Sequence, residues 1–395
     1  MPAVKAMNVM YNELVHHADA EDMVDFVGAP FGIDKLFIRR CYVSLYEMCT
    51  NVWKTVEQKF IRPIVLLGTP GIGKSCFFMY LLMREKEKGN RVFFKVDDSG
   101  TFLFDPREGV AKMPRVDMDD LFISEVDTNT LFVADAVPPI RRPYPRKHRV
   151  ILITSPKRSV WFDFDKQCRG IKLFLPLWSH EEIVTFCEKM GNGYSQEEIA
   201  EKMKWIGGTV RYLTDHPDEL EKRIPLQFSS ESFYGFLKDR IEYKGGSASH
   251  RLVHIDVPYD KEKGRYQFHM YNLVFASDAI RDKVLDWVAW DEFSLLRPIF
   301  SICSREYTDR TASGILFEHA CHRMLEKGGT FICTSLEENG SDKKSTMVIK
   351  LRRTDGNAQT FREDGDILKM KDQYSVPHVP NVVDGIPTMV IKFEK

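Results

Sequence analysis

Residues 68–75 carry the amino-acid types that bind a phosphate chain. They read GTPGIGKS and match the pattern G-x-x-x-x-G-K-[ST] in full. The glycines allow successive backbone N–H groups to turn toward a phosphate, because no Cβ stands in the way. Lys74 is expected to reach the β- and γ-phosphates, and the Ser75 hydroxyl is expected to ligate Mg²⁺. The predicted binding residues for ATP, or for another nucleoside triphosphate, are Gly68, Thr69, Pro70, Gly71, Ile72, Gly73, Lys74 and Ser75.

Asp135 is the candidate that completes a magnesium site together with Ser75. It ends the apolar run LFVAD, and P-loop proteins hold Mg²⁺ with an acidic residue at the end of a strand near the loop. The alternative is an ordinary aspartate at a strand end. Ala136 follows, where many hydrolytic P-loop enzymes carry a glutamate that activates water. The sequence therefore supports nucleotide binding better than turnover.

Thr154 and Arg211 are the candidates for contacts with the γ-phosphate. The run RVILIT ends in Thr154 and is followed by Ser155. Hydroxyl groups at such a strand tip are able to sense a γ-phosphate, although a Ser-Pro turn explains them equally well. Arg211 follows the glycine pair at 207–208, and an arginine there neutralises phosphate charge when a helical subdomain closes over the loop. A solvated surface arginine is the alternative.

Five apolar runs around these residues predict the strands that position them. Each run is apolar along its whole length, which is typical of strands that helices bury on both faces. The pattern predicts an α/β fold, namely a P-loop NTPase with a mainly parallel sheet and helices on both faces. The predicted strands are residues 61–67, 91–96, 130–135, 149–154 and 171–177.

Helices are predicted before and after this sheet. Residues 35–60 carry apolar side chains at three- and four-residue spacing, which predicts a helix. Ser179 with Glu182 three residues later predicts a capping box, and a further helix ends at the glycines 207–208. A helical subdomain is therefore expected to follow the sheet.

Length and linker composition predict two main domains. The chain has 395 residues, which is too long for one domain of typical size. The segment KGGSASH is the best candidate for a linker. The predicted parts are a lead-in at 1–34, the P-loop NTPase domain at 35–243, the linker at 244–250 and a C-terminal domain at 251–395.

The composition is that of a globular chain without excess charge. Fifty-six basic and 57 acidic residues give a net charge of −1, so a nucleic-acid partner would need a local basic patch. The eight cysteines form no C-x-x-C pair, which excludes a zinc ribbon and favours a reduced compartment. No apolar run approaches the ~18 residues of a membrane helix, and residues 1–30 lack the pattern of a signal peptide. The sequence by itself thus indicates a soluble intracellular chain with no membrane partner.

From about residue 36 onward the chain resembles the Crinkler and retrotransposon-hot-spot class of proteins, best known as effectors of oomycetes, chytrids and some symbiotic fungi. The resemblance rests on motifs that occur in order: FIRRCYVSLYEMC, PIVLLGTPGIGKSCFFMYLL, VADA, ITSP, LFLPLWSHEEI and GGTVRYL. It implies an ATPase of the additional-strand type, with Lys74, Ser75 and Asp135 in the nucleotide roles. It also implies secretion and action at DNA in a host nucleus, where the protein promotes cell death or suppresses defence.

The resemblance further implies that the C-terminal part is an α+β restriction-endonuclease-like domain. Such nucleases place a helix Glu, a strand Asp and an E/Q-x-K group around Mg²⁺, which generates the attacking hydroxide. Glu318 and Asp384 match the first two positions, and Asp384 is the candidate metal ligand. For the third position only Lys392 and Glu394 are near, so the site is expected to be either truncated or inactive. The segments that resemble the nuclease helix and strand are residues 313–331 and 374–386.

Two further features bear on the partners. Residues 141–149, RRPYPRKHR, form the densest basic run and favour either a nuclear-import or DNA-backbone patch or a solvated loop. Residues 1–34 lack the ubiquitin-like header with an L-F-L-A-K signal of oomycete Crinklers, so export is implied by relatives alone. No sequence feature indicates an oligomeric state.

The leading hypothesis is an ATP-dependent switch that controls a Mg²⁺-dependent, DNA-directed nuclease-like domain. Two alternatives stay open. One is a nucleotide-gated module that binds DNA or a host protein without cutting it. The other is an ATPase of a mobile-element lineage with no effector role.

Overall fold

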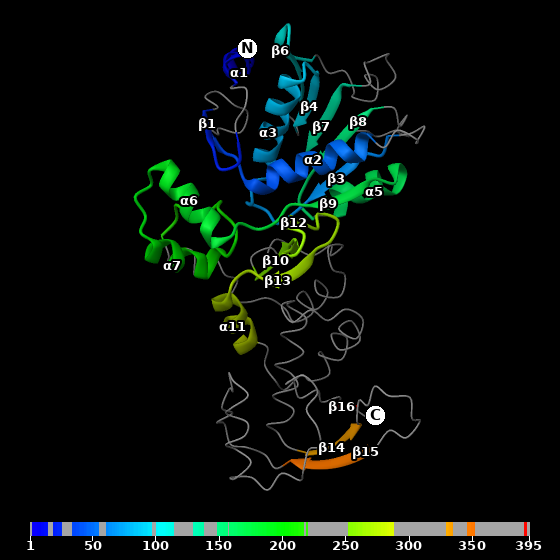
Figure 1. Cartoon of the computed structure of the whole chain (residues 1–395), viewed down its shortest axis with the longest axis vertical. Coiled ribbons are helices and arrows are strands. Elements are labelled where there is room, and N and C mark those ends of the chain that lie inside the picture. Colours follow the sequence, from blue (N-terminus) through cyan, green and yellow to red (C-terminus); the bar gives the residue numbers. More distant parts are fainter. Residues whose placement is uncertain are drawn as a thin grey trace. The chain divides into compact units, whose positions relative to one another are not determined.

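The structure of this chain is a computed structural model (Figure 1). It divides into two units, Met1–Gly314 and Ile315–Lys395, and each is described by itself. The described residues are 2–14, 19–25, 34–54, 61–96, 100–113, 129–137, 148–156, 158–216, 219, 252–287, 329–334, 346–351 and 391–392.

A seven-stranded sheet forms the centre of the first unit. Its strand order is β6-β5-β4-β7-β8-β3-β9, and the five strands from β4 to β9 are parallel. The mainly parallel sheet predicted from the sequence is confirmed. The antiparallel strands β5 and β6 at one edge were not predicted. The strands are β3 (Ile64–Leu67), β4 (Val92–Val96), β5 (Gly100–Asp105), β6 (Gly109–Lys112), β7 (Leu131–Asp135), β8 (Arg149–Ile153) and β9 (Ile171–Phe174).

The order of the parallel strands decides which chain segments meet at one edge of the sheet. Strand β8 lies between β3, which leads into residues 68–75, and β7, which ends in Asp135. This inserted strand is the arrangement that the additional-strand resemblance implies. Because parallel strands end at the same edge, the segments that follow β3, β7 and β8 come together there.

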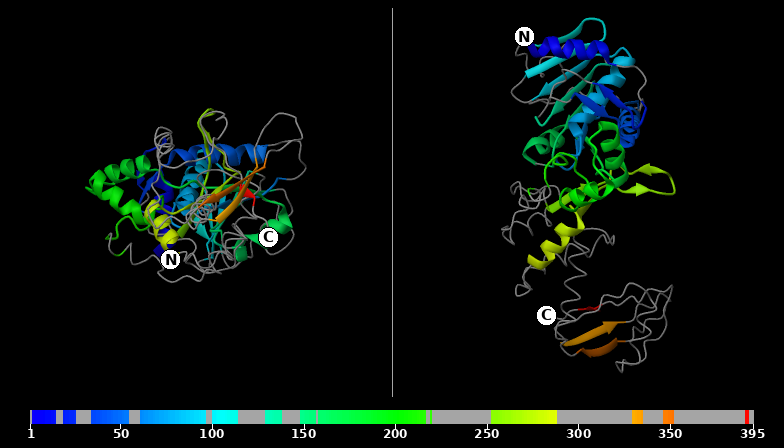
Figure 2. Two further views of the ribbon diagram at one scale, coloured as in Figure 1. Left: turned by 90° about the horizontal axis from the view of Figure 1, so that it is seen from below. Right: turned by 90° about the vertical axis from the view of Figure 1, so that its left-hand side faces the viewer.

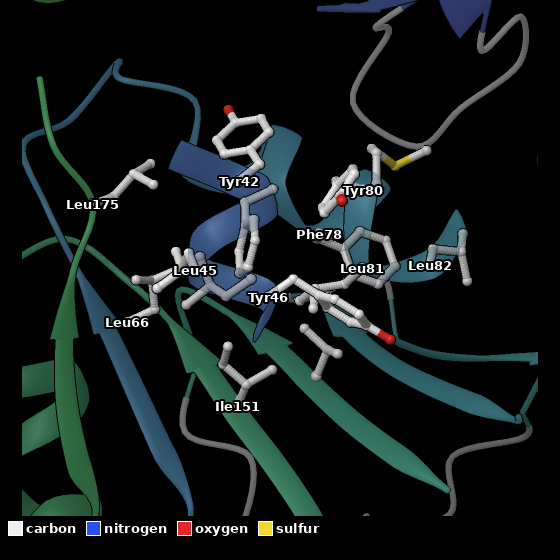
Figure 3. Packing of buried hydrophobic residues seen from close by; sticks show 14 of the residues in the cluster. Tyr42, Leu45, Tyr46, Leu66, Phe78, Tyr80, Leu81, Leu82, Ile151 and Leu175 are labelled. Atoms are coloured by element: carbon white, nitrogen blue, oxygen red, sulfur yellow. The ribbon is translucent and has the colours of Figure 1, made fainter. Parts of the chain in front are cut away.

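Helices pack on the sheet through apolar side chains. Right-handed crossovers lead from β3 through α3 to β4 in one direction and from β8 through α5 to β9 in the other, which places α3 and α5 on opposite faces (Figure 2). Figure 3 shows side chains of α2 and α3 packed over Leu66 and Ile151 of the sheet. These helices are α1 (Pro2–Glu13), α2 (Arg40–Lys54), α3 (Lys74–Glu87) and α5 (Arg158–Cys168).

The helix predicted at 35–60 is shorter than expected. Residues Lys35–Phe37 form strand β2, which pairs antiparallel with β1 (Met23–Asp25). Helix α2 begins at Arg40, and residues 55–60 lie outside the described residues. The apolar spacing did not separate strand from helix, because Leu36 and Phe37 are buried in both cases.

Two helices follow the sheet and confirm the predicted helical subdomain. They are α6 (His180–Met190) and α7 (Gln196–Ile206). Each begins with a complete capping box, in which the Ser179 or Ser195 hydroxyl accepts from the backbone N–H three residues later. The glutamate of each box accepts in return from the serine N–H.

The next described segment, residues 252–287, also belongs to the first unit. Strands β10 (Val253–Asp256) and β13 (Asn272–Phe275) pair antiparallel, as do the short strands β11 (Tyr259–Asp260) and β12 (Arg265–Tyr266), and α11 (Asp278–Trp287) follows. The sequence assigned these residues to the C-terminal domain, whereas the structure groups them with the sheet. A backbone bond from Phe174 N to Phe268 O, 2.8 Å, joins them to the end of β9. The predicted linker at 244–250 lies outside the described residues.

The second unit is described only at three strands, β14 (Gly329–Thr334), β15 (Thr346–Leu351) and β16 (Ile391–Lys392). They form an antiparallel sheet in the order β15-β14-β16. Lys392 lies opposite Ile332 in this register, while Glu318 and Asp384 lie outside the described residues. The restriction-endonuclease-like fold therefore stays a prediction.

The end of the basic run at 141–149 belongs to the core of the first unit. Residues 141–147 lie outside the described residues. Arg149 begins β8 and binds the completely buried Glu85 through two hydrogen bonds of 3.2 and 2.7 Å. This arginine is therefore not part of a DNA-contact patch. Among the described residues, no helix is long and apolar enough to cross a membrane.

Candidate nucleotide-binding site

The loop at 68–75 connects β3 to α3 and needs glycine at two of its positions. Gly71 and Gly73 have φ values of +88° and +96°, in the left-handed region that other residues avoid. A Cβ on Gly73 would lie 2.4 Å from the Tyr42 hydroxyl oxygen, and one on Gly71 would lie 2.8 Å from the Arg211 Cβ. Both glycines are thus required by conformation and by close packing.

Lys74 is the first residue of α3 and is buried. Its ammonium group donates to the carbonyl oxygens of Gly68 and Thr69 at 2.9 and 2.8 Å. Burial lowers the pKa of Lys74 to about 7; the Asp135 carboxylate opposes this shift and the positive charge of Arg211 adds to it. The lysine is therefore folded back on its own loop in surroundings that favour an added negative charge.

Ser75 and Asp135 meet although 60 residues separate them. The Ser75 hydroxyl donates to Asp135 Oδ2 at 2.7 Å. Burial raises the pKa of Asp135, while the bond from Ser75 and the charge of Lys74 oppose that rise. A hydroxyl and a carboxylate are oxygen ligands of the kind that Mg²⁺ prefers. No group of three or more His, Cys, Asp or Glu able to hold a metal occurs among the described residues, so phosphate oxygens and water would have to complete the coordination.

Thr154 lies directly after β8, between the loop strand and the Asp135 strand. Its backbone N–H donates to Leu66 O at 3.0 Å. The side chain is buried, and its hydroxyl has no hydrogen-bond partner among the described residues. A buried hydroxyl without a hydrogen-bond partner costs free energy. A polar ligand that bonded to the Thr154 hydroxyl would remove this cost.

Arg211 lies beside Gly71 of the loop, and its predicted contact with a γ-phosphate stays a prediction. The neighbouring Val210 N–H donates to Gly71 O at 3.2 Å. The Arg211 side chain is exposed, and its charge acts on Lys74. The structure thus brings Lys74, Ser75 and the three distant residues Asp135, Thr154 and Arg211 to one edge of the sheet.

The sequence did not predict three residues outside the motif whose side chains bond to carbonyl groups of the loop. Arg39 is completely buried and donates to Ile72 O at 3.2 Å. The Tyr42 hydroxyl donates to Gly73 O at 2.7 Å, and Trp178 Nε1 donates to Ile72 O at 2.9 Å. Arg39 and Tyr42 lie in the run FIRRCYVSLYEMC that carried the family resemblance, but nothing in that run indicates contact with a loop 30 residues later.

A second missed contact joins the loop to β10. The Thr69 hydroxyl accepts from Ile255 N at 2.8 Å, and Thr69 is buried. Nearby, Asp256 accepts from Leu177 N and Val257 N at 3.4 and 2.9 Å. No local pattern at 68–75 signals this contact, because the partner strand lies 186 residues away.

Comparison with known proteins places the chain among sequence relatives. No family model matches it. Crinkler effector protein 16 of Phytophthora infestans is 25% identical over 313 residues, which cover 76% of this chain and 48% of that protein. Crinkler effector protein 15 of the same organism is 25% identical over 315 residues, with the same coverage. The chain spans about half the length of these curated relatives.

Solved structures show a weaker likeness. The Thermotoga maritima RuvB Holliday junction branch migration motor aligns with 52% of this chain and 77% of its own, at a TM-score of 0.31 and 12% identity. AMPPCP-bound DnaA from Aquifex aeolicus aligns with 52% of this chain and 72% of its own, at a TM-score of 0.29 and 14% identity. TM-scores this low carry no argument about the fold.

The fold assignment rests instead on the strand order and on the phosphate loop between β3 and α3. The motif order and the sequence matches point to the same relatives. The chain is a homologue of the Crinkler effectors and has a P-loop NTPase-like α/β fold with a mostly parallel central sheet.

Proposed function

We propose that this chain binds ATP, or another nucleoside triphosphate, together with Mg²⁺ through residues 68–75 and uses it as a switch. The observation that carries the proposal is the bond of 2.7 Å between Ser75 and Asp135 at the mouth of the loop. It joins the two side chains expected to hold Mg²⁺, next to a lysine whose ammonium group bonds to the loop carbonyls of Gly68 and Thr69. A glycine-rich turn that binds nothing would not need this arrangement.

The residues have distinct roles in this proposal. Lys74 exchanges its two carbonyl acceptors for phosphate oxygens, which are stronger acceptors because they are charged. Ser75 and Asp135 hold the metal, which neutralises charge on the phosphates. The unpartnered Thr154 hydroxyl contacts the γ-phosphate or the water beside it. Arg211 approaches the same phosphate from the end of α7.

Hydrolysis is part of the proposal, but with a slow turnover. Position 136 holds alanine in a left-handed conformation, with φ of +58°, and has no carboxylate to activate water. Water would be oriented only by hydroxyl groups such as that of Thr154. Slow hydrolysis suits a switch, because the triphosphate state then persists.

The Lys74→Ala variant tests nucleotide binding. Its ATP affinity should fall by at least about 100-fold, measured by calorimetry with Mg²⁺, since a charged contact to phosphate is lost. Lys88→Ala removes an exposed lysine at the other end of α3 and should bind as the wild type does. Equal ATP affinity in the wild type and Lys74→Ala would refute the proposal.

We further propose that the nucleotide state controls the C-terminal segment as a DNA-directed nuclease in a host nucleus. The support is the motif resemblance at Glu318 and Asp384 and the effector names of the curated relatives. Purified protein with plasmid, Mg²⁺ and ATP should then nick DNA, and Asp384→Ala should not. DNA that is bound but uncut would favour the nucleotide-gated binding module instead. Absence of both effects would favour an ATPase with no effector role.

A further inference from the structure

Two consecutive carbonyl groups of the phosphate loop are held from outside the loop. Ile72 O accepts from Arg39 Nη1 at 3.2 Å and from Trp178 Nε1 at 2.9 Å. Besides the first helical bond of α3, from Phe77 N at 3.0 Å, Gly73 O accepts from an outside donor, the Tyr42 hydroxyl, at 2.7 Å. Arg39 directly precedes α2 and Tyr42 lies in its first turn, and both side chains are completely buried. None of the three donors belongs to the glycine-rich motif.

A hydrogen bond that fixes the direction of a backbone C=O also fixes the direction of the N–H of the next residue. In a trans peptide group the C=O and the next N–H point in opposite directions, and the described residues contain no cis peptide bond. Gly71 O is also held, by Val210 N at 3.2 Å. The N–H groups of Ile72, Gly73 and Lys74 therefore point away from these donors. Successive amides that turn the same way around left-handed glycines form a concave site for an anion.

We propose that Arg39 and Tyr42 are positioning residues of the phosphate site, which set the direction of the Gly73 and Lys74 amides before a nucleotide binds. This inference rests on the proposed function, because it assigns those amides to the phosphates of a nucleoside triphosphate. It adds two residues outside the motif, which touch neither metal nor phosphate and act through the backbone of the loop.

Arg39 suits this role because its whole guanidinium group is committed. It donates to Glu182 at 2.9 and 3.3 Å and to Pro176 O and Leu177 O at 3.1 and 2.8 Å, in addition to Ile72 O. The planar fork of arginine fixes all these directions together, which a lysine cannot do. The same side chain thus ties the loop to the start of the helical subdomain.

Tyr42→Phe is the sharpest test, because Tyr46→Phe offers a matched control on the same helix. The Tyr46 hydroxyl is buried and donates to Glu85 at 2.9 Å, away from the loop (Figure 3). Both variants lose one buried hydroxyl bond and should lose similar stability in urea. Only Tyr42→Phe should weaken binding of ATP with Mg²⁺, by about three- to tenfold, the value of one hydrogen bond.

Arg39→Lys has a matched control in Arg149→Lys, since Arg149 also pairs with a buried glutamate of this unit. Each lysine keeps the positive charge beside its glutamate. Only Arg39→Lys should weaken ATP binding, by about tenfold or more, because it loses the bond to Ile72 O. Pyrophosphate should show the same loss as ATP, because the amides bind phosphate and not the base.

The outcomes separate this inference from the function on which it rests. If the wild type binds ATP and Tyr42→Phe binds it as tightly as Tyr46→Phe does, the positioning role is wrong and the proposed function stands. A loss seen with ATP but not with pyrophosphate would also overturn the role. If the wild type binds no nucleoside triphosphate, the proposed function fails and the inference fails with it.

Discussion

The two ends of the central sheet each hold a buried arginine–glutamate pair, and the pairs differ in what else they bind. At the carboxyl ends of the parallel strands, Arg39 pairs with Glu182 at 2.9 Å. At the amino ends, Arg149, the first residue of β8, pairs with Glu85 at 2.7 Å. Both guanidinium groups also lie over a tryptophan ring.

The remaining hydrogen bonds of the two pairs have different partners. Glu85 also accepts from the Tyr46 hydroxyl and from Asn90 at 2.9 and 2.8 Å, which completes a network of core side chains. The remaining donors of Arg39 go to backbone carbonyls of the phosphate loop and of the segment before α6.

A buried ion pair gains little net stability, because desolvation offsets the attraction. We therefore expect the Arg149 pair to maintain the packing of the core. We expect the Arg39 pair to position the loop at residues 68–75. This difference would be established if variants of the two arginines lose similar unfolding free energy and only the Arg39 variants lose affinity for a nucleotide.

Loss of either arginine should have the largest effect on stability. Arg39→Met and Arg149→Met each leave a largely or wholly buried carboxylate without its partner, so each should lose about 3–5 kcal/mol of unfolding free energy in urea. Replacing the glutamate as well, in Arg149→Met with Glu85→Gln, should recover part of that loss. A loss below about 1 kcal/mol for either single variant would contradict this expectation, because it would mean that water solvates the unpaired glutamate.

Alanine at a loop glycine should have the next largest effect. Gly73→Ala combines an unfavourable φ of +96° with a Cβ 2.4 Å from the Tyr42 hydroxyl, whereas Gly89 has φ of +71° and open space around its Cβ. We expect a loss of about 2–4 kcal/mol for Gly73→Ala and about 1–2 kcal/mol for Gly89→Ala. Only Gly73→Ala should also weaken ATP binding. Urea unfolding and calorimetry measure the two effects, and equal losses would show that packing against α2 does not constrain the loop.

The smallest effect is a pH dependence confined to the carboxyl edge. Burial lowers the pKa of Lys74 to about 7 without nucleotide, and bound phosphates would raise that pKa again. Binding then takes up a proton above pH 7, so the affinity for ATP is highest below pH 7 and falls as the pH rises. The fall should be about fivefold between pH 7 and pH 8.

Lys74→Arg provides the control for this dependence, because arginine stays charged over the whole range. Its affinity for ATP should stay nearly constant between pH 7 and pH 8. A wild-type affinity that is equally constant would show that Lys74 is already charged in the free protein.

Local sequence was sufficient wherever a short stretch decides its own conformation. The fully apolar runs predicted β3, β4, β7, β8 and β9, because strands buried on both faces need apolar side chains throughout. The spacing of Ser179 and Glu182 predicted the start of α6, since a capping box is closed within four residues. The sequence did not predict β5 and β6, whose side chains are only partly buried, so that neither strand is a fully apolar run.

The site shows the same division. The motif at 68–75 predicted the loop between β3 and α3, and the end of an apolar run predicted the place of Asp135 at the end of β7. The hydrogen bond between Ser75 and Asp135 depends on the sheet. The strand that leads to Ser75, β3, and the strand that ends in Asp135, β7, are both neighbours of β8. Arg211 lies beside the loop because the segment after α7 packs on Gly71, where Val210 N donates to Gly71 O.

The sequence by itself thus determined the glycine-rich loop and the mainly parallel α/β sheet on which it lies, and its motifs pointed to the Crinkler effectors as relatives. Only the tertiary structure decided how the loop is held. Arg39, Tyr42 and Ile255 touch it from positions 31 to 186 residues away, and such contacts leave no periodicity or spacing in the sequence. The physical reason is that a buried hydrogen bond depends on where two segments meet in space, whereas a sequence pattern records only what neighbours along the chain require of one another.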